Sequence, residues 1–136
     1  MDQASMKRLH EEAALWTWAE RCGEAGERQL PRLILDCCQA AYDLAFGDSP
    51  PVQKKRAVFE AVAAGKLDAA VRAMMAADCR VAFEEDGTRG VRARMEQPGL
   101  GAAASTVARH PVAAQLRSLL ELVLTVPPEQ RALALA

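Results

Sequence analysis

The sequence predicts an all-α fold, an irregular bundle of six or seven short helices. Apolar residues recur at intervals of three and four along most of the chain, and the alternation typical of a half-buried strand is nearly absent. The composition agrees, because the 136 residues include 28 alanines, the residue of highest helix propensity, and only six aromatic residues. With 51% apolar residues, the chain is too apolar for a disordered protein, and its length suits one domain.

The first predicted helix begins at Ser5, whose hydroxyl suits an N-cap, and ends near Gly23. We expect its core-facing stripe to consist of Met6, Leu9, Ala13 and Trp16. Leu15 and Ala19 widen this stripe. Trp16 and Trp18 lie about 200° apart around a helix of about 3.6 residues per turn, so they cannot both face one core. One tryptophan is therefore expected at a rim or contact surface.

The second predicted helix covers about 27–46. Pro31 is tolerated in its first turn, and Gly47 ends it. The helix carries a continuous apolar stripe formed by Leu30, Leu33, Ile34, Cys37, Ala41 and Leu44.

Two shorter helices are expected to follow. The third covers about 51–64 and ends at Gly65. The fourth starts at Leu67, and we expect it to continue through Val81 and Phe83 until a polar break of two glutamates, an aspartate and a glycine.

The last third of the chain is also predicted to be helical. A short basic helix covers 90–97, and a second helix, about 101–109, follows the tight turn at 98–101. The last strong helix covers 112–126, with a stripe formed by Leu116, Leu119, Leu120 and Val123. The remaining residues, 128–136, are expected to form a frayed C-terminal tail.

These helices are joined by short loops, which favours antiparallel neighbours and suits an irregular HEAT-like stack. The predicted organisation has an N-terminal helical pair at 1–50. A helical bundle at 51–127 packs with this pair as one domain, and the tail at 128–136 follows.

The charge balance argues against several kinds of partner. There are 17 basic and 18 acidic side chains, so the basic surplus of nucleic-acid-binding proteins is missing, and few aromatic residues are present to stack on bases. The apolar runs are shorter than the roughly 18 residues of a membrane helix. The N-terminal sequence MDQASMKRLHEE lacks the apolar region of a secretory signal. We expect an intracellular, reducing location, with no direct nucleic-acid or membrane partner.

The sequence predicts no metal, cofactor or catalytic residue. Cys22, Cys37, Cys38 and Cys79 form no zinc-module spacing and are expected to be reduced, buried apolar residues. The alternative is a metal site, to which His10 or His110 could supply a nitrogen. Neither histidine has a carboxylate partner on a matching helix face, and phosphate-loop, nucleophile-elbow and metalloprotease motifs are missing. These observations predict a protein that is not an enzyme.

The segment 99–111, with the sequence GLGAAASTVARHP, resembles the signature of the TFIIS N-terminal domain family. In that family a Gly-Ile-Gly turn opens a helix that ends in a Lys/Arg-His pair. Gly99 and Gly101 match the turn, Ala104 and Val107 match the inward apolar positions, and Arg109-His110-Pro111 matches the end. The resemblance covers roughly 55–126. It departs from the family in an alanine-rich turn helix and in Pro127, near where the family often has a tryptophan.

The resemblance implies a compact bundle of about five helices without catalysis or cofactor. Such a domain docks short disordered segments of partner proteins in transcription elongation and related nuclear complexes. The contact would lie on two interhelical loops, formed here by Gly65 and Lys66 and by His110, Pro111 and Val112. The implied location is nuclear.

An alternative hypothesis is a small cytoplasmic helical adaptor, a chaperone or a homodimer that uses its N-terminal amphipathic helices. Its anchor residues would be Leu15, Trp16 and Trp18. Exposed apolar surface on the two loops would favour the first hypothesis, and an exposed patch over 6–19 would favour the alternative.

Overall fold

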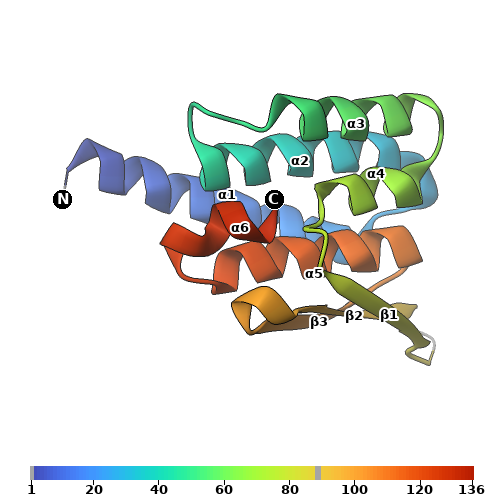
Figure 1. The fold of residues 1–136 in the computed structure, drawn as a ribbon. Helices are drawn as coiled ribbons and strands as arrows, with labels where there is room; N and C mark the ends of the chain where they lie inside the picture. Colours follow the sequence, from blue (N-terminus) through green and yellow to red (C-terminus); the bar gives the residue numbers. More distant parts are fainter. Residues whose placement is uncertain (1, 88–89) are drawn as a thin grey trace.

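The computed structural model describes residues 2–87 and 90–136. Over these residues the chain forms six α-helices and a three-stranded antiparallel sheet (Figure 1). The helices are α1 (Gln3–Glu24), α2 (Leu30–Phe46), α3 (Val52–Ala63), α4 (Leu67–Met74), α5 (Pro111–Thr125) and α6 (Arg131–Ala134). The strands are β1 (Arg80–Glu85), β2 (Val91–Gln97) and β3 (Ala102–Ala108), and short 3-10 turns lie at Glu27–Gln29, Pro98–Leu100 and Pro128–Gln130.

The central element is α5, which lies between the sheet and the other helices (Figure 1). One side of α5 packs on β2 and β3, and the rest of its surface meets α1, α2 and α4. Ten of its 15 residues are buried. One continuous core therefore extends from the sheet through α5 to α1 and α2.

The predicted stripes of the two strongest helices are confirmed. In α2 the residues Leu30, Leu33, Ile34, Cys37 and Ala41 are buried and Leu44, the last of the stripe, is partly buried; in α5 Leu116, Leu119, Leu120 and Val123 are buried. α2 ends at Gly47, as expected. Helical periodicity of large apolar residues therefore identified both helices and the faces that they bury.

The prediction of an all-α fold is correct for most of the chain but wrong for residues 80–108. The expected helix over 90–97 is strand β2, and the expected helix over 101–109 is strand β3. The two pair antiparallel, with Met95 opposite Ala104 and Ala93 opposite Thr106. Val91 and Met95, which suggested a helix face, are four residues apart, and four residues return to the same face in a strand as well.

The fourth helix is also shorter than predicted. α4 ends at Met74, and the chain then turns before β1, so Val81 and Phe83 lie in a strand and not in a helix. Pairing with β2 decides this outcome, because each residue of β1 lies opposite one residue of β2, from Arg80 with Glu96 to Glu85 with Val91. Such pairing joins residues far apart in the chain, which local propensity does not register.

Two buried hydroxyl groups join the sheet to α5. The Thr106 hydroxyl lies 3.1 Å from the Ala114 carbonyl oxygen and 2.6 Å from the Ser118 hydroxyl, and the Ser118 hydroxyl lies 3.0 Å from the Ala93 carbonyl oxygen. Ala113 and Ala114, at the start of α5, are both fully buried. Small side chains thus let helix and sheet approach closely enough for hydroxyl contacts.

The segment 128–136, predicted as a frayed tail, is packed against the core as α6. Ala134 and Leu135 are fully buried, and Arg131 is 5% exposed. The Arg131 side chain donates to the Val123 carbonyl oxygen (3.1 Å) and to the Glu12 carboxylate (2.9 Å). This arginine therefore links the end of the chain to both α5 and α1.

Lys54 provides a second anchor for the same end of the chain. Its ammonium group donates to the carbonyl oxygens of Met75 (3.0 Å) and Leu135 (2.6 Å), with Met74 slightly farther away. Carbonyl oxygens at the end of α4 are natural partners for a cation, because they are left free by the helix. Burial lowers the pKa of Lys54.

Candidate functional site

The second half of α1 is held in the core, whereas its first half extends beyond the bundle (Figure 1). Leu15, Ala19 and Cys22 follow one another at helical spacing and are buried. α5 and α2 are the main neighbours of this face. The first half of α1 therefore presents most of its surface to solvent.

A second apolar face of α1 is exposed to solvent. It is formed by Met6, Leu9, Ala13 and Trp16, which we call the α1 stripe. The three large side chains Met6, Leu9 and Trp16 are exposed by 48, 50 and 41%. The prediction that this stripe faces the core is wrong, since it lies about 130° around the helix from the buried face.

Leu15 and the two tryptophans, the anchors of the alternative hypothesis, have three different environments. Leu15 is fully buried and so belongs to the core. Trp16 is exposed on the α1 stripe, and Trp18 is half-buried on the other flank of the helix. The expectation that the tryptophans face different surroundings is confirmed.

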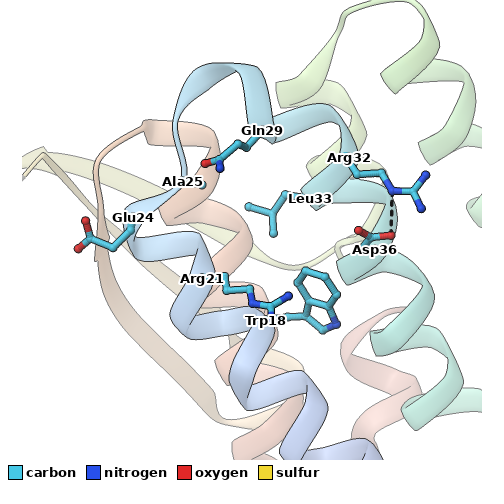
Figure 2. Close-up of a pocket in the computed structure, with 8 residues that line it drawn as sticks. All are labelled: Trp18, Arg21, Glu24, Ala25, Gln29, Arg32, Leu33 and Asp36. Atoms are coloured by element: carbon cyan, nitrogen blue, oxygen red, sulfur yellow. Dashed lines mark ion pairs between the residues drawn. The ribbon is translucent and has the colours of Figure 1, made fainter.

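Trp18 lines a hollow on the surface between the end of α1 and the start of α2 (Figure 2). The hollow has a volume of about 430 Å³. We call it the α1–α2 groove, and it is lined by Trp18, Arg21, Glu24, Ala25, Gln29, Arg32, Leu33 and Asp36. Trp18, Ala25 and Leu33 give it an apolar interior, and charged side chains surround them.

Local contacts position the groove residues. The Gly26 N–H donates to the side-chain oxygen of Gln29 over 2.9 Å, which fixes the turn between the two helices. The Arg21 guanidinium lies 4.6 Å from the centre of the Trp18 ring, a cation–π contact that holds both side chains at the mouth of the groove. On the other wall, Arg32 and Asp36 form an ion pair with an N–O distance of 3.3 Å (Figure 2).

Arg21 differs from Arg32 in its electrostatic environment. No carboxylate lies within ion-pair distance of Arg21 among the described residues, whereas Arg32 is paired with Asp36. The positive charge of Arg21 is therefore free to meet an anionic group. A ligand side chain in the groove would find an aromatic wall, an aliphatic wall and one available cation.

The two loops implied by the family resemblance have little apolar surface. Gly65 ends α3 in a left-handed conformation (φ 74°), and both Gly65 and Lys66 are exposed. His110 is the N-cap of α5, Pro111 is its exposed first residue, and Val112 packs partly against the core. The loops thus expose little beyond a glycine, a lysine and a proline, and their role in binding stays a prediction.

The thiol pKa is raised at three cysteines, Cys37, Cys38 and Cys79. Cys22, Cys37 and Cys38 are fully buried, as predicted for apolar residues, whereas Cys79 is only partly buried. The neighbouring Cys22 thiol and burial raise the pKa of Cys37, and burial raises the pKa of Cys38 to about 12 and that of Cys79 to about 11. These three thiols are therefore protonated at neutral pH, the form that is not nucleophilic.

Sequence reasoning placed either Trp16 or Trp18 at a contact surface and missed the rest of the groove. Arg21 and Ala25 follow Trp18 at helical spacing, and Gln29, Leu33 and Asp36 repeat that spacing on the next helix. The only sign of the groove in the sequence was therefore that these residues follow one another at helical spacing on two consecutive helices. The sequence alone did not show that the two faces meet, because Leu33 was already explained as a core residue.

In the described residues, no group of three or more histidine, cysteine, aspartate or glutamate side chains is arranged to hold a metal ion. Within the same ranges, none of the helices has the length and apolar character needed to cross a membrane. Comparison with protein-family models, with curated proteins and with solved structures gives no match. The resemblance to the TFIIS N-terminal domain family therefore stays a prediction.

Proposed function

We propose that this protein is a non-catalytic interaction module that binds a short segment of a partner protein in the α1–α2 groove. An apolar side chain of the segment inserts between Trp18 and Leu33, and a neighbouring carboxylate meets Arg21. The observation that carries the proposal is the groove itself, which combines an apolar interior with a cation that has no recorded ion-pair partner among the described residues.

The physical properties of the groove suit this role. Its volume of about 430 Å³ lies in the range of small-ligand sites, which starts at about 300 Å³. Tryptophan and arginine are the residue types that most often dominate binding energy at protein interfaces. Arg21 already lies against Trp18, so a partner would not have to order a freely rotating side chain.

The test uses a random peptide library displayed on phage and selected against the purified protein. We expect the selected peptides to share an apolar residue next to Asp or Glu. Their Kd should rise about tenfold, equivalent to about 1.4 kcal/mol, on Arg21→Glu. Trp18→Ala should abolish binding. Arg56→Glu, which reverses an exposed charge on α3, is the matched control and should leave the Kd unchanged.

Two outcomes would contradict the proposal. One is a library that yields no enriched sequence. The other is a set of peptides whose Kd is the same for the wild type and Arg21→Glu. Backbone amide chemical shifts add a direct readout, because bound peptide should shift the signals of residues 18–36 more than those of α3.

A second candidate function is supported by the exposed α1 stripe. Met6, Leu9, Ala13 and Trp16 alternate in steps of three and four, the spacing of a coiled-coil seam. This surface suits an amphipathic helix of a partner, and it corresponds to the adaptor, chaperone or homodimer alternative. Leu9→Lys separates the two functions, because it should abolish pairing through the stripe and leave peptide binding in the groove intact.

A further inference from the structure

Strand β1 is an open edge of the sheet. The strand order is β1-β2-β3, so β1 has one hydrogen-bonded neighbour and its other edge is free. α5 lies over β2 and β3, and five of the six residues of β1 are exposed. In Figure 1 β1 runs along the outer margin of the sheet, away from the other helices.

The sequence of β1 leaves this edge suited to further pairing. The strand is six residues long and has no proline, the residue that most directly blocks an edge. Phe83 is 43% exposed. It lies on the same sheet face as half-buried Val81, since the two are opposite Ala93 and Met95 of β2. An exposed phenylalanine on a regular open edge is a strong reason to look for a strand partner.

We propose that β1 pairs antiparallel with β1 of a second copy of the chain, about a two-fold axis at Ala82. Residues opposite each other in an antiparallel pair lie on the same face of the sheet. Val81 then lies opposite Phe83 of the second copy, and Phe83 lies opposite Val81. The pairing joins two three-stranded sheets into one of six strands and forms a four-residue apolar cluster on the face that carries α5.

The charges of β1 complement each other in the same register. Arg80 lies opposite Glu84 of the second copy, and the two-fold axis repeats this contact. Arg80 is exposed and has no ion-pair partner among the described residues. Glu84 already accepts from Arg94 through Oε1 (2.7 Å), which leaves Oε2 for the second copy. The charged side chains of β1, which hinder pairing with an unrelated strand, would thus attract each other when β1 pairs with β1 of a second copy.

Neighbouring registers lack this agreement. Moving the axis to Phe83 places Val81 opposite Glu85, an apolar side chain against a charge. The acidic residues beyond the strand ends are already held within the chain. Asp86 forms an ion pair with Arg92 (3.5 Å), and Asp78 accepts from the Gly99 N–H (2.9 Å). The five-residue pairing over 80–84, centred on Ala82, is therefore the one that satisfies both faces of β1.

The first experiment measures oligomeric state by sedimentation velocity over a concentration series. We expect a wild-type monomer–dimer equilibrium. Arg80→Glu creates two like-charge contacts, each opposed by up to about 1 kcal/mol, and should weaken the dimer at least about tenfold. Glu84→Arg should do the same. A mixture of Arg80→Glu with Glu84→Arg chains should restore the dimer, because each charge then meets its opposite. Arg28→Glu is the matched control and should dimerise like the wild type.

The second experiment does not depend on how well the charge variants fold. In a Cys79→Ser background, Ala82→Cys places two thiols opposite each other on the axis. Their Cα atoms would be about 4.5–5.5 Å apart, within reach of a disulfide. Mild oxidation should therefore give a covalent dimer. Ala103→Cys on the opposite edge strand, β3, is the control and should stay monomeric.

Three results would overturn the proposal. They are a wild-type monomer at the highest soluble concentration, a dimer that Arg80→Glu leaves unchanged, and failure of Ala82→Cys to cross-link. A dimer that dissociates on Leu9→Lys but not on Arg80→Glu would assign self-association to the α1 stripe and overturn β1 pairing. Peptide binding in the α1–α2 groove is measured separately, so neither proposal depends on the other.

Discussion

Leu15 and Leu9 lie six residues apart on the same helix, yet Leu15 is fully buried and Leu9 is 50% exposed. The second half of α1 packs on α5 and α2, whereas the first half runs past them. Both halves carry apolar residues at helical spacing, so amphipathic spacing identifies the helix but not which apolar side chains are covered. What decides is which side of α1 the neighbouring helices cover, because Leu9 and Leu15 lie about 120° apart around the helix.

The largest expected effect compares these two leucines directly. Leu15→Ala should lower the free energy of unfolding by about 3 kcal/mol, because it removes a fully buried side chain and leaves a cavity. Leu9→Ala should change it by no more than about 0.5 kcal/mol. Urea unfolding followed by circular dichroism measures both values. Equal losses for the two variants would show that the first half of α1 is also packed in solution.

A smaller effect is expected at Glu12, where the exposed and buried halves of α1 meet. Arg131→Met keeps most of the side-chain volume but leaves the Val123 carbonyl and the partly exposed Glu12 without their donor. We expect a loss of about 2 kcal/mol in the free energy of unfolding. Arg131→Met with Glu12→Gln should recover part of this loss in a double-mutant cycle. Independent, additive losses would mean that the pair does not fix α1.

The smallest effects concern two carboxylates with opposite pKa shifts. In the exposed half of α1, the Ser5 N–H donates to Asp2 and lowers its pKa, so its stabilising contribution is lost as the pH falls through that value. On α5, burial raises the pKa of Glu121, with Arg117 opposing, so its contribution is lost as the pH rises through the raised value.

Near neutral pH, Glu121→Gln should therefore leave stability equal or raise it by up to about 0.5 kcal/mol, and the difference should vanish in acid. Asp2→Ala should fray the first turn of α1 without changing global unfolding, as measured by amide hydrogen exchange. Thermal unfolding over a pH series tests Glu121. A wild type more stable than Glu121→Gln at neutral pH would contradict the assigned sign.

The parts of the fold that could be predicted are those in which the spacing of large apolar side chains fits only one type of secondary structure. Leu116, Leu119, Leu120 and Val123 fit a helix and no strand, and all are buried in α5. Residues 102–108 contain four alanines, which favour a helix by propensity yet pair as a strand with β2. Their conformation depends on a neighbouring strand, and an alanine-rich segment has too few large side chains to show an alternating pattern.

The candidate site was predictable only in part for a related reason. One of Trp16 and Trp18 could be assigned to a contact surface, because one helix cannot turn two tryptophans 200° apart toward one core, but the spacing did not say which. Leu33 contributes both to the core and to the wall of the groove. Its place in the apolar stripe is explained by the core alone, so the sequence does not reveal its second role. The open edge of β1 was not predictable, since the strand itself was assigned to a helix.

The hydroxyl groups of Thr106 and Ser118 carry two protons for three close contacts. Only two of these contacts can be occupied by a hydrogen at one time. The two hydroxyl hydrogens can therefore be arranged in more than one way along the chain of contacts from Ala114 through Thr106 and Ser118 to Ala93. Whichever order is populated, at least one hydrogen bond still joins the sheet to α5. Loss of one hydroxyl would leave the other free to donate without competition, so the energetic cost of removing both groups would differ from the sum of the single costs.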